Sequence, residues 1–202
     1  MTASMAGVSR PNPFATRHTR PGRLVPRDAS GAPLDLAALL SRASDLRTAA
    51  IEGPHGAGKT NLLVTLAGLL AQAGRHAGTL RPRSWRDGLT VLRAVRGAAP
   101  RAILCIDSWE ALGRPWAAIV RWAARRRRVG LLVTSHAATG LPVLVRCETS
   151  ASLLSRLVAE LPEHLGLIGP ADVEQAFSAR RGDIREALYD LYDRFERRAR
   201  SG

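Results

Sequence analysis

The stretch Ile51-Glu52-Gly53-Pro54-His55-Gly56-Ala57-Gly58-Lys59-Thr60 decides the fold of this chain. It begins as the end of an apolar strand, continues as a glycine-rich loop and predicts the first turn of a helix. Gly53, Gly58, Lys59 and Thr60 fill every fixed position of the pattern G-x-x-x-x-G-K-[ST]. Loops of this pattern wrap backbone N–H groups around phosphate oxygens, because glycine reaches backbone conformations that other residues avoid. The stretch therefore predicts a phosphate-binding loop between a strand and a helix.

Each part of this loop has an expected role at a bound nucleotide. The Lys59 ammonium would reach the β- and γ-phosphates, and the Thr60 hydroxyl would bind Mg²⁺. The helix that begins here adds the positive end of its dipole. Lys59 is also the single lysine among 30 basic residues, and the wide guanidinium of an arginine would not fit a phosphate cradle. The predicted nucleotide-binding residues are Gly53, Pro54, His55, Gly56, Ala57, Gly58, Lys59, Thr60 and Asn61.

The composition limits the class of protein and its partners. The chain has 202 residues, of which 46% are apolar, so it can bury the core of one domain with a small appendage. No apolar run is long enough to span a membrane, and no signal peptide is visible. Cys105 and Cys147 lie in apolar stretches, which favours a reduced, cytoplasmic setting. The net charge of +13 indicates nucleic acid, an acidic protein or a membrane surface as partner, and an arginine-biased composition without a partner explains it equally well.

The chain divides into three predicted segments. Residues 1–34 are rich in proline, glycine and arginine and predict an extended basic arm with Phe14 as its anchor. This arm either lies over the nucleotide base or forms a disordered tail, and we expect partial order near residues 12–24. Residues 35–162 predict the nucleotide-binding core. Residues 163–202 have a helical period and predict a small lid with an arginine-rich end.

The fold class predicted for the core is α/β, with a five-stranded, mainly parallel sheet flanked by helices. Residues 101–107 form a nearly continuous apolar run that ends in Asp107, as in a parallel strand buried on both faces. Asp107 would lie at the same edge of the sheet as the loop and would bind Mg²⁺ together with Thr60. The strands are expected at residues 48–52, 76–80, 101–107, 130–135 and 143–147.

Polar residues near this edge are candidates for catalysis. Ser135 and His136 follow a buried strand, and either would sense the γ-phosphate or hold the attacking water, unless they are ordinary loop polarity. Glu110 begins a helix expected over residues 110–128 and is the candidate base that orients water. That helix ends in four arginines at residues 125–128. Because a crossover helix returns to the opposite edge of the sheet, this run indicates a partner surface or a solvated helix end.

The order of these parts resembles the AAA+ and STAND (NB-ARC-like) P-loop ATPases over roughly residues 35–195. The stretches Asp107-Ser108-Trp109-Glu110-Ala111-Leu112 and Thr134-Ser135-His136 are similar to the STAND segments Asp-x-x-Glu-x-Leu and Thr-Ser-Arg. AAA+ lids carry a G-[DN]-x-R segment whose arginine reaches the γ-phosphate. The segment Gly182-Asp183-Ile184-Arg185 gives that role to Arg185, with a surface arginine as the alternative. The stretch at residues 12–17 also resembles short stand-alone bacterial P-loop ATPases.

Two residues depart from these families. AAA+ proteins place a catalytic glutamate directly after the Walker B aspartate, where this chain has Ser108. STAND proteins have arginine where this chain has His136. Both departures predict tight nucleotide binding with slow turnover. Arg146 is the candidate for an arginine finger that acts in a neighbouring subunit of a homo-oligomer.

The sequence therefore predicts a protein that binds ATP and Mg²⁺ and hydrolyses ATP slowly, or when a partner stimulates it, to drive a conformational switch. ATP rather than GTP follows from the resemblance, and no Asn-Lys-x-Asp segment that reads guanine is present. The alternatives are a non-hydrolysing switch or scaffold, a nucleic-acid-associated ATPase and a small-molecule kinase. The predicted catalytic residues are Lys59, Glu110, Ser135 and Arg185, with Thr60 and Asp107 on the metal.

Overall fold

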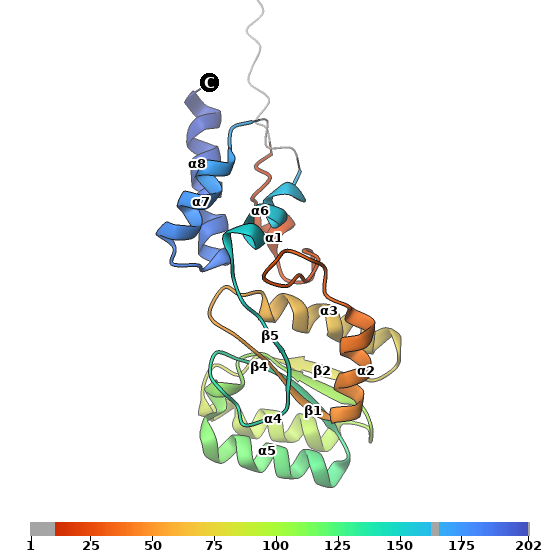
Figure 1. Cartoon of the computed structure of the whole chain (residues 1–202). Coiled ribbons are helices and arrows are strands. Elements are labelled where there is room, and N and C mark those ends of the chain that lie inside the picture. The colour runs from red at the N-terminus through yellow and green to blue at the C-terminus, as the bar shows by residue number, and fades with distance from the viewer. Residues whose placement is uncertain (1–10, 163–165, 202) are drawn as a thin grey trace, which may run out of the picture.

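The computed structural model describes residues 11–162 and 166–201 (Figure 1). A sheet with helices on both faces forms one body, and a helical unit that includes the C-terminal helix stands beyond one edge of this sheet. The first ten residues of the expected arm, and residues 163–165 at the expected start of the lid, lie outside the described part. Within that part, no helix is long and apolar enough to cross a membrane.

The sheet has five strands in the order β2-β3-β4-β1-β5, and every neighbouring pair is parallel. This arrangement confirms the predicted α/β class. Because all strands point the same way, the loops that follow them meet at one edge of the sheet. Glu52 lies opposite Ser135 in the pairing of β1 with β4, so the glycine-rich loop leaves the sheet beside the end of β4. The strands are β1 (Thr48–Glu52), β2 (His76–Leu80), β3 (Ile103–Ile106), β4 (Gly130–Ser135) and β5 (Val143–Arg146).

Helices cover both faces of this sheet, because its central strands are apolar on both sides. One face buries Ile51 and Leu132 against Leu66 of a helix that follows the loop. The other face buries Leu104 and Leu131 under the two helices that follow β2 and β3. Each fully buried side chain of this kind contributes about 1.5–3 kcal/mol. The helices are α2 (Leu36–Leu46) and α3 (Lys59–Gln72) on the first face, and α4 (Gly88–Gly97) and α5 (Gly113–Arg127) on the second.

The helical unit has a second apolar core that the arm completes. Phe14 of the arm is 2% exposed and packs against Phe195, with 6.4 Å between the ring centroids. The Asn12 side chain donates a hydrogen bond of 3.1 Å to the backbone oxygen of Tyr192. Leu154 shares this core, although it precedes the expected boundary at residue 162. The helices of the unit are α1 (Thr16–Thr19) in the arm, α6 (Ala151–Ala159), α7 (Pro170–Ala179) and α8 (Ile184–Ser201).

The helix expected over residues 110–128 is divided in two. A short 3₁₀ helix, η2 (Trp109–Leu112), ends at Gly113, and α5 begins there. The φ angle of Gly113 is +69°, a backbone conformation that favours glycine and interrupts regular hydrogen bonding. As a result, Glu110 is held in η2 beside the strand edge and not in the first turn of the long helix. A similar 3₁₀ helix, η1 (Trp85–Asp87), precedes α4 and is capped by Ser84.

Candidate functional site

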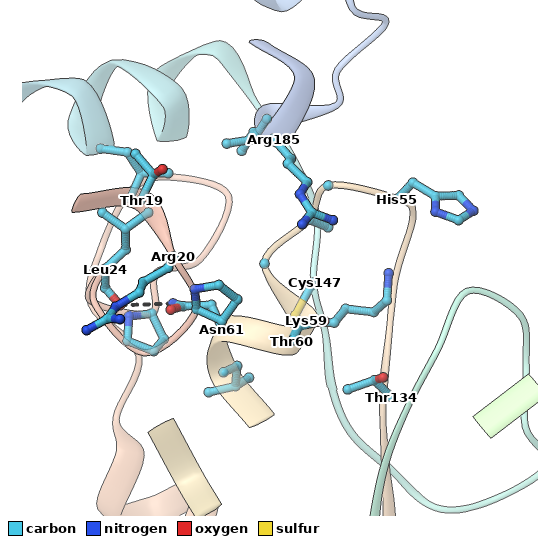
Figure 2. A pocket seen from close by; sticks show the side chains of 18 of the residues that line it. Thr19, Arg20, Leu24, His55, Lys59, Thr60, Asn61, Thr134, Cys147 and Arg185 are labelled. Carbon is cyan, nitrogen blue, oxygen red and sulfur yellow. Dashed lines mark hydrogen bonds between the residues drawn. The ribbon is translucent and has the colours of Figure 1, made fainter. Parts of the chain in front are cut away.

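A cavity of about 350 Å³ lies where the strand edge, the arm and the helical unit meet. Its lining includes the loop from His55 to Asn61. Figure 2 shows Lys59, Thr60 and Thr134 on one side of this space, Thr19 and Leu24 of the arm on another, and Arg185 entering from the helical unit. Three segments far apart in the sequence therefore form one cavity.

The glycine-rich loop has the backbone that its sequence predicts. Gly53 and Gly56 have φ angles of +154° and +70°. A Cβ atom at Gly53 would collide with the backbone oxygen of Cys147, and one at Gly56 would collide with the Asp183 carboxylate. Both positions thus need glycine for its conformation and for the close approach of neighbouring groups. The second contact places the start of α8 directly on the loop.

Lys59 is 6% exposed, and its ammonium turns back onto its own loop. It donates to the backbone oxygens of Gly53 at 2.7 Å and Pro54 at 2.5 Å, and it lies 2.9 Å from Nδ1 of His136. Burial lowers the pKa of Lys59, since it disfavours the charged form, while nearby carboxylates oppose that shift. The ammonium is therefore held by neutral acceptors that phosphate oxygens could replace.

The metal-binding residues predicted from the sequence lie in contact. Thr60 Oγ1 donates to the Asp107 carboxylate, at 3.0 Å from Oδ1 and 3.2 Å from Oδ2. Asp107 is 5% exposed and accepts a further bond of 2.6 Å from Thr134 Oγ1. Arg81, at the end of β2, places its Nε 3.4 Å from Asp107 Oδ2.

The Thr60 hydroxyl and the Asp107 carboxylate fit a Mg²⁺ ion that is bound jointly by the protein and by phosphate groups. One hydroxyl oxygen and one carboxylate are the usual protein share of such a site, because Mg²⁺ keeps waters and takes its other ligands from phosphates. In the described ranges, no group of three or more His, Cys, Asp or Glu side chains forms a metal site by itself. The fit to Mg²⁺ thus depends on a bound phosphate.

His136 connects Lys59 to Glu110. Its Nδ1 faces the Lys59 ammonium, and its Nε2 lies 3.4 Å from Glu110 Oε1. Burial and then the charge of Lys59 lower the pKa of His136. A neutral His136 with its proton on Nε2 satisfies both neighbours, since Nδ1 then accepts and Nε2 donates. The ring also stacks on His55 of the loop, with 3.5 Å between centroids.

Ser135 does not lie where the sequence predicted a catalytic hydroxyl. It is 2% exposed, and its Oγ accepts a bond of 3.2 Å from the backbone N–H of Ala137. The cavity is lined instead by Thr134 and His136, the residues on either side. Because side chains alternate along a strand, an error of one residue moves a side chain to the other face. Thr134 is therefore the polar tip of β4 at this site.

Arg185 is the second residue of α8, and it lines the cavity opposite the loop (Figure 2). Asp183 accepts a bond of 3.0 Å from the backbone N–H of Glu186 and so caps this helix. The cap and the contact of Asp183 with Gly56 fix the direction in which α8 leaves the loop. The structure thereby brings Arg185 to the same cavity as Lys59, which lies 126 positions earlier in the sequence.

The other end of the cavity is apolar and includes the arm. Leu24, Leu157 and Tyr189 are among the residues that line it. The Asn61 side chain holds the arm here, since Oδ1 accepts from the Gly22 N–H at 2.7 Å and Nδ2 donates to the Leu24 oxygen at 2.9 Å. The second of these bonds is the dashed line in Figure 2. Asn61 thus acts as a clamp on the arm and does not simply extend the phosphate loop.

Sequence reasoning missed Arg81, Thr134 and Tyr189. Arg81 and Thr134 had a usable signal, because both are polar residues at the carboxyl ends of parallel strands, where ligands bind. Tyr189 had none, because its place depends on how the helical unit that contains α8 is set against the glycine-rich loop.

Comparison with known proteins adds little to this geometry. No family model and no curated protein matches the chain. Among solved structures, Caenorhabditis elegans PCH-2 is similar at 14% identity, with a TM-score of 0.43, over 81% of this chain and 67% of that chain. Domain III of the Thermotoga maritima replication initiation protein DnaA is similar at 15% identity, with a TM-score of 0.45, over 79% of this chain and 90% of that chain. Both likenesses are too distant to assign a family.

The fold and the loop define the class of protein by themselves. The chain is an α/β protein with a five-stranded parallel sheet and a glycine-rich loop of the P-loop pattern at its strand edge.

Proposed function

We propose that this chain is a P-loop ATPase of the AAA+/STAND kind, in which Mg·ATP closes a switch and slow or partner-stimulated hydrolysis opens it. The observation that carries the proposal is the convergence of Lys59, the Thr60–Asp107 pair and Arg185 on one cavity. These groups come from the loop, from β3 and from α8. An ammonium, a metal-binding pair and a guanidinium around one space suit the triphosphate of a nucleotide.

Binding would begin with an exchange of partners at Lys59. The β- and γ-phosphate oxygens would replace the Gly53 and Pro54 carbonyls that now accept from the ammonium. Loop N–H groups and the start of α3 would surround the β-phosphate. Since an anion also favours the charged form of lysine, bound nucleotide would raise the lowered pKa of Lys59.

Thr60 and Asp107 would hold Mg²⁺, which supplies positive charge that stabilises the charge developing on the phosphates. The Thr134 hydroxyl, 2.6 Å from Asp107, would keep that carboxylate oriented. Arg81 would give up its contact with Asp107 and turn toward the phosphates, where it adds a second cation beside Lys59.

Glu110 would orient the attacking water through His136. The neutral His136 links the two sides of the cavity, and release of Lys59 to the phosphates would free its Nδ1 to accept from water. Glu110 would then accept from Nε2 and hold the ring in that tautomer. Hydrolysis would be slow by this route, because the base acts through an imidazole and does not touch the water itself.

The apolar end of the cavity would take the base of the nucleotide. Leu24 and Leu157 offer apolar surface there, and Tyr189 offers an aromatic ring. ATP in preference to GTP remains part of this proposal, as do assembly into a homo-oligomer, with Arg146 of one subunit serving the next, and a reduced, cytoplasmic setting.

Two alternatives have specific observations in their favour. Ser108 stands where AAA+ proteins have a catalytic glutamate, which favours a switch that binds ATP without hydrolysing it. The net charge of +13 favours an ATPase associated with nucleic acid.

The test is ATP binding and phosphate release by the wild type and by Lys59→Ala, Lys59→Arg, Arg185→Ala and Glu110→Gln. We expect both Lys59 variants to bind ATP about 100-fold more weakly, because arginine does not fit the cradle. Arg185→Ala should weaken ATP binding about 5- to 10-fold, Glu110→Gln should keep most binding, and both should lose phosphate release. Arg197→Ala removes an exposed arginine at the far end of the same helix and serves as the matched control.

The outcomes separate the candidates. Binding that needs Lys59, without release in the wild type at any partner concentration, establishes the switch. Binding of ATP that is unchanged in both Lys59 variants would contradict the proposal as a whole.

A further inference from the structure

The layer formed by α4 and α5 carries an unbalanced positive charge. Between Asp87 and Glu148 the chain contains only two carboxylates. Asp107 lines the nucleotide cavity, and Glu110 pairs with His136 beside it. Six exposed arginines belong to the two helices and their ends, and no carboxylate lies among them. They are Arg93 and Arg96 of α4, and Arg125, Arg126, Arg127 and Arg128 at the end of α5.

The ends of the two helices bring these arginines together. Both helices bury one side in the same core against the sheet, so their exposed sides face away from it together. Arg127 of α5 donates a bond of 2.7 Å to the backbone oxygen of Arg96 at the end of α4. Arg128 then leads into β4, at the edge of the sheet opposite the glycine-rich loop. The six arginines thus lie on two neighbouring helices whose ends are in contact, a region that we call the α4–α5 basic face.

No ion pair neutralises this face within residues 88–147, all of which the structure describes. The dipole of α5 favours cations in its last turn, and that effect is about 0.3–1 kcal/mol per charge at an exposed site. It accounts for an arginine at a helix end but not for six arginines that repel one another on two helices. A polyanion would relieve this repulsion.

An aromatic ring lies within the same face. Trp122 is 58% exposed and stands one turn before the arginine run. The guanidinium of Arg126 lies 5.4 Å from its ring centroid, which leaves much of the ring open to solvent. A tryptophan with an open ring beside guanidinium groups is the arrangement with which proteins bind unpaired bases and their phosphates.

We propose that the α4–α5 basic face binds single-stranded nucleic acid, with phosphates on the arginines and a base stacked on Trp122. We expect a single strand to bind better than a duplex, because stacking on Trp122 needs the open face of an unpaired base and a duplex hides the faces of its bases. An acidic protein would pair with the arginines, but it would give the open Trp122 ring no partner. Since the face lies at the opposite edge of the sheet from the cavity, this binding is independent of the proposed nucleotide site.

The test is fluorescence anisotropy of a labelled oligothymidylate of about 20 nucleotides, measured against salt with the full chain. We expect Arg125→Ser/Arg126→Ser to weaken binding and to make the slope of log K against log salt shallower by about 1.4, for two lost phosphate contacts. Trp122→Ala should weaken binding roughly 5- to 100-fold at every salt concentration, and Trp122→Phe should restore most of it.

Two control variants match these changes elsewhere in the molecule. Trp85 is 62% exposed and has Arg86 beside it, but it precedes α4, about 15 Å from the end of that helix. Arg197→Ser/Arg200→Ser removes two exposed charges from the end of α8. Both Trp85→Ala and this double variant should bind the strand as the wild type does.

Several results would overturn the proposal. One is an equal loss of strand affinity in the variants of the basic face and in the control variants, and another is affinity that does not change in Trp122→Ala. The others are a duplex that competes better than the single strand, or polyglutamate that competes equally at matched charge. Thermal melts of each variant establish that the fold is intact, as expected for exposed side chains. Retained binding by Lys59→Ala would show that this site stands even if the nucleotide proposal fails.

Discussion

Two arginine-rich regions of this molecule differ in what faces their charge. Residues 166–201 of the helical unit carry seven arginines and seven carboxylates, whereas residues 88–147 carry ten arginines and two carboxylates. In the helical unit Asp172 contacts Arg194 and Arg198, and Asp190 contacts Arg180 as well as Arg194. Among the residues that the structure describes, no arginine of the α4–α5 basic face has such a partner.

The difference separates charges that hold the fold from charges that are free for a partner. Asp172 is in the first turn of α7, and its two arginines are on α8, so the carboxylate braces one helix against the other. Since α8 begins with the segment that contains Arg185, this bracing also helps to fix the arginine at the cavity. In the part of the chain that the structure describes, the arginines of α4 and α5 make one link between helices, the bond from Arg127 to the Arg96 backbone oxygen, and no carboxylate takes part in it.

The largest expected effect is on stability, from loss of the Asp172 carboxylate. Asp172 accepts from Arg198 at 2.6 and 2.7 Å and from the backbone N–H of Gly169 at 2.9 Å. We expect Asp172→Ala to lower the free energy of unfolding by about 2 kcal/mol, because it removes a helix cap and a paired carboxylate. Urea denaturation measures this loss.

Glu174→Ala is the matched control for this change. Glu174 is an exposed carboxylate on the same helix that makes no ion pair within residues 11–162 and 166–201, and its loss should change stability by less than about 0.5 kcal/mol. Equal effects of the two variants would remove the distinction between bracing and free charges.

The same carboxylate predicts how stability depends on pH. Hydrogen bonds from Arg198 and from Gly169 lower the pKa of Asp172 below its ordinary value of 3.8. A lowered pKa means that the carboxyl takes up a proton more readily in the unfolded chain than in the folded one. The contribution of the ionised Asp172 to the free energy of unfolding is therefore present above pH 3.8 and is lost as pH falls toward the folded pKa. The stability difference between the wild type and Asp172→Asn should therefore shrink steadily below about pH 4. If this stability difference stays constant from pH 7 to pH 3, it comes from packing and not from the charge of Asp172.

A smaller effect is expected at the nucleotide cavity. Loosening α7 from α8 should allow Arg185 to move, and we expect Asp172→Ala to weaken ATP binding about fivefold, or roughly 1 kcal/mol. Arg125→Ser/Arg126→Ser should leave ATP binding unchanged, because α5 ends at the opposite edge of the sheet. Isothermal titration with ATP and Mg²⁺ measures both. If the two variants weaken binding equally, nucleotide affinity follows overall charge and not the position of Arg185.

Local sequence predicted the parts of the site that depend on local chemistry. The spacing from Gly53 to Thr60 predicted the loop, and the apolar run before Asp107 predicted a strand that ends in a carboxylate. Both features are determined by residues that are neighbours in the sequence, together with the parallel sheet that the pattern of strands implies. The contact of Thr60 with Asp107 then follows from the topology.

The remaining parts depend on packing between distant segments. The clamp from Asn61 to the arm joins residues 39 and 37 positions apart, and the bond from Asn12 to Tyr192 joins residues 180 positions apart. No local period encodes these contacts. The prediction of Ser135 in place of Thr134 was wrong for another reason, because the orientation of the last side chain of a strand depends on the register with its neighbours.

The smallest expected effect is the stability of a chain with a thinned α4–α5 basic face. Repulsion among the neighbouring guanidinium groups, which no carboxylate offsets, opposes the favourable interaction of Arg125 and Arg126 with the α5 dipole. The two effects should nearly cancel with the repulsion slightly larger, so Arg125→Ser/Arg126→Ser should change the free energy of unfolding by less than about 0.5 kcal/mol. The sign should be stabilising at low ionic strength and should vanish near 1 M salt, where the Debye length is about 3 Å. Urea denaturation at two salt concentrations measures this difference.

The same double substitution is informative because binding and folding should respond in opposite directions. Loss of strand affinity together with an unchanged or higher stability would mean that these arginines are retained for a partner. A clear loss of stability at low salt would mean instead that the run supports the end of α5, for example through the bond from Arg127 to the Arg96 backbone. In that case both arginine-rich regions would serve the fold, and the contrast between them would be one of composition alone.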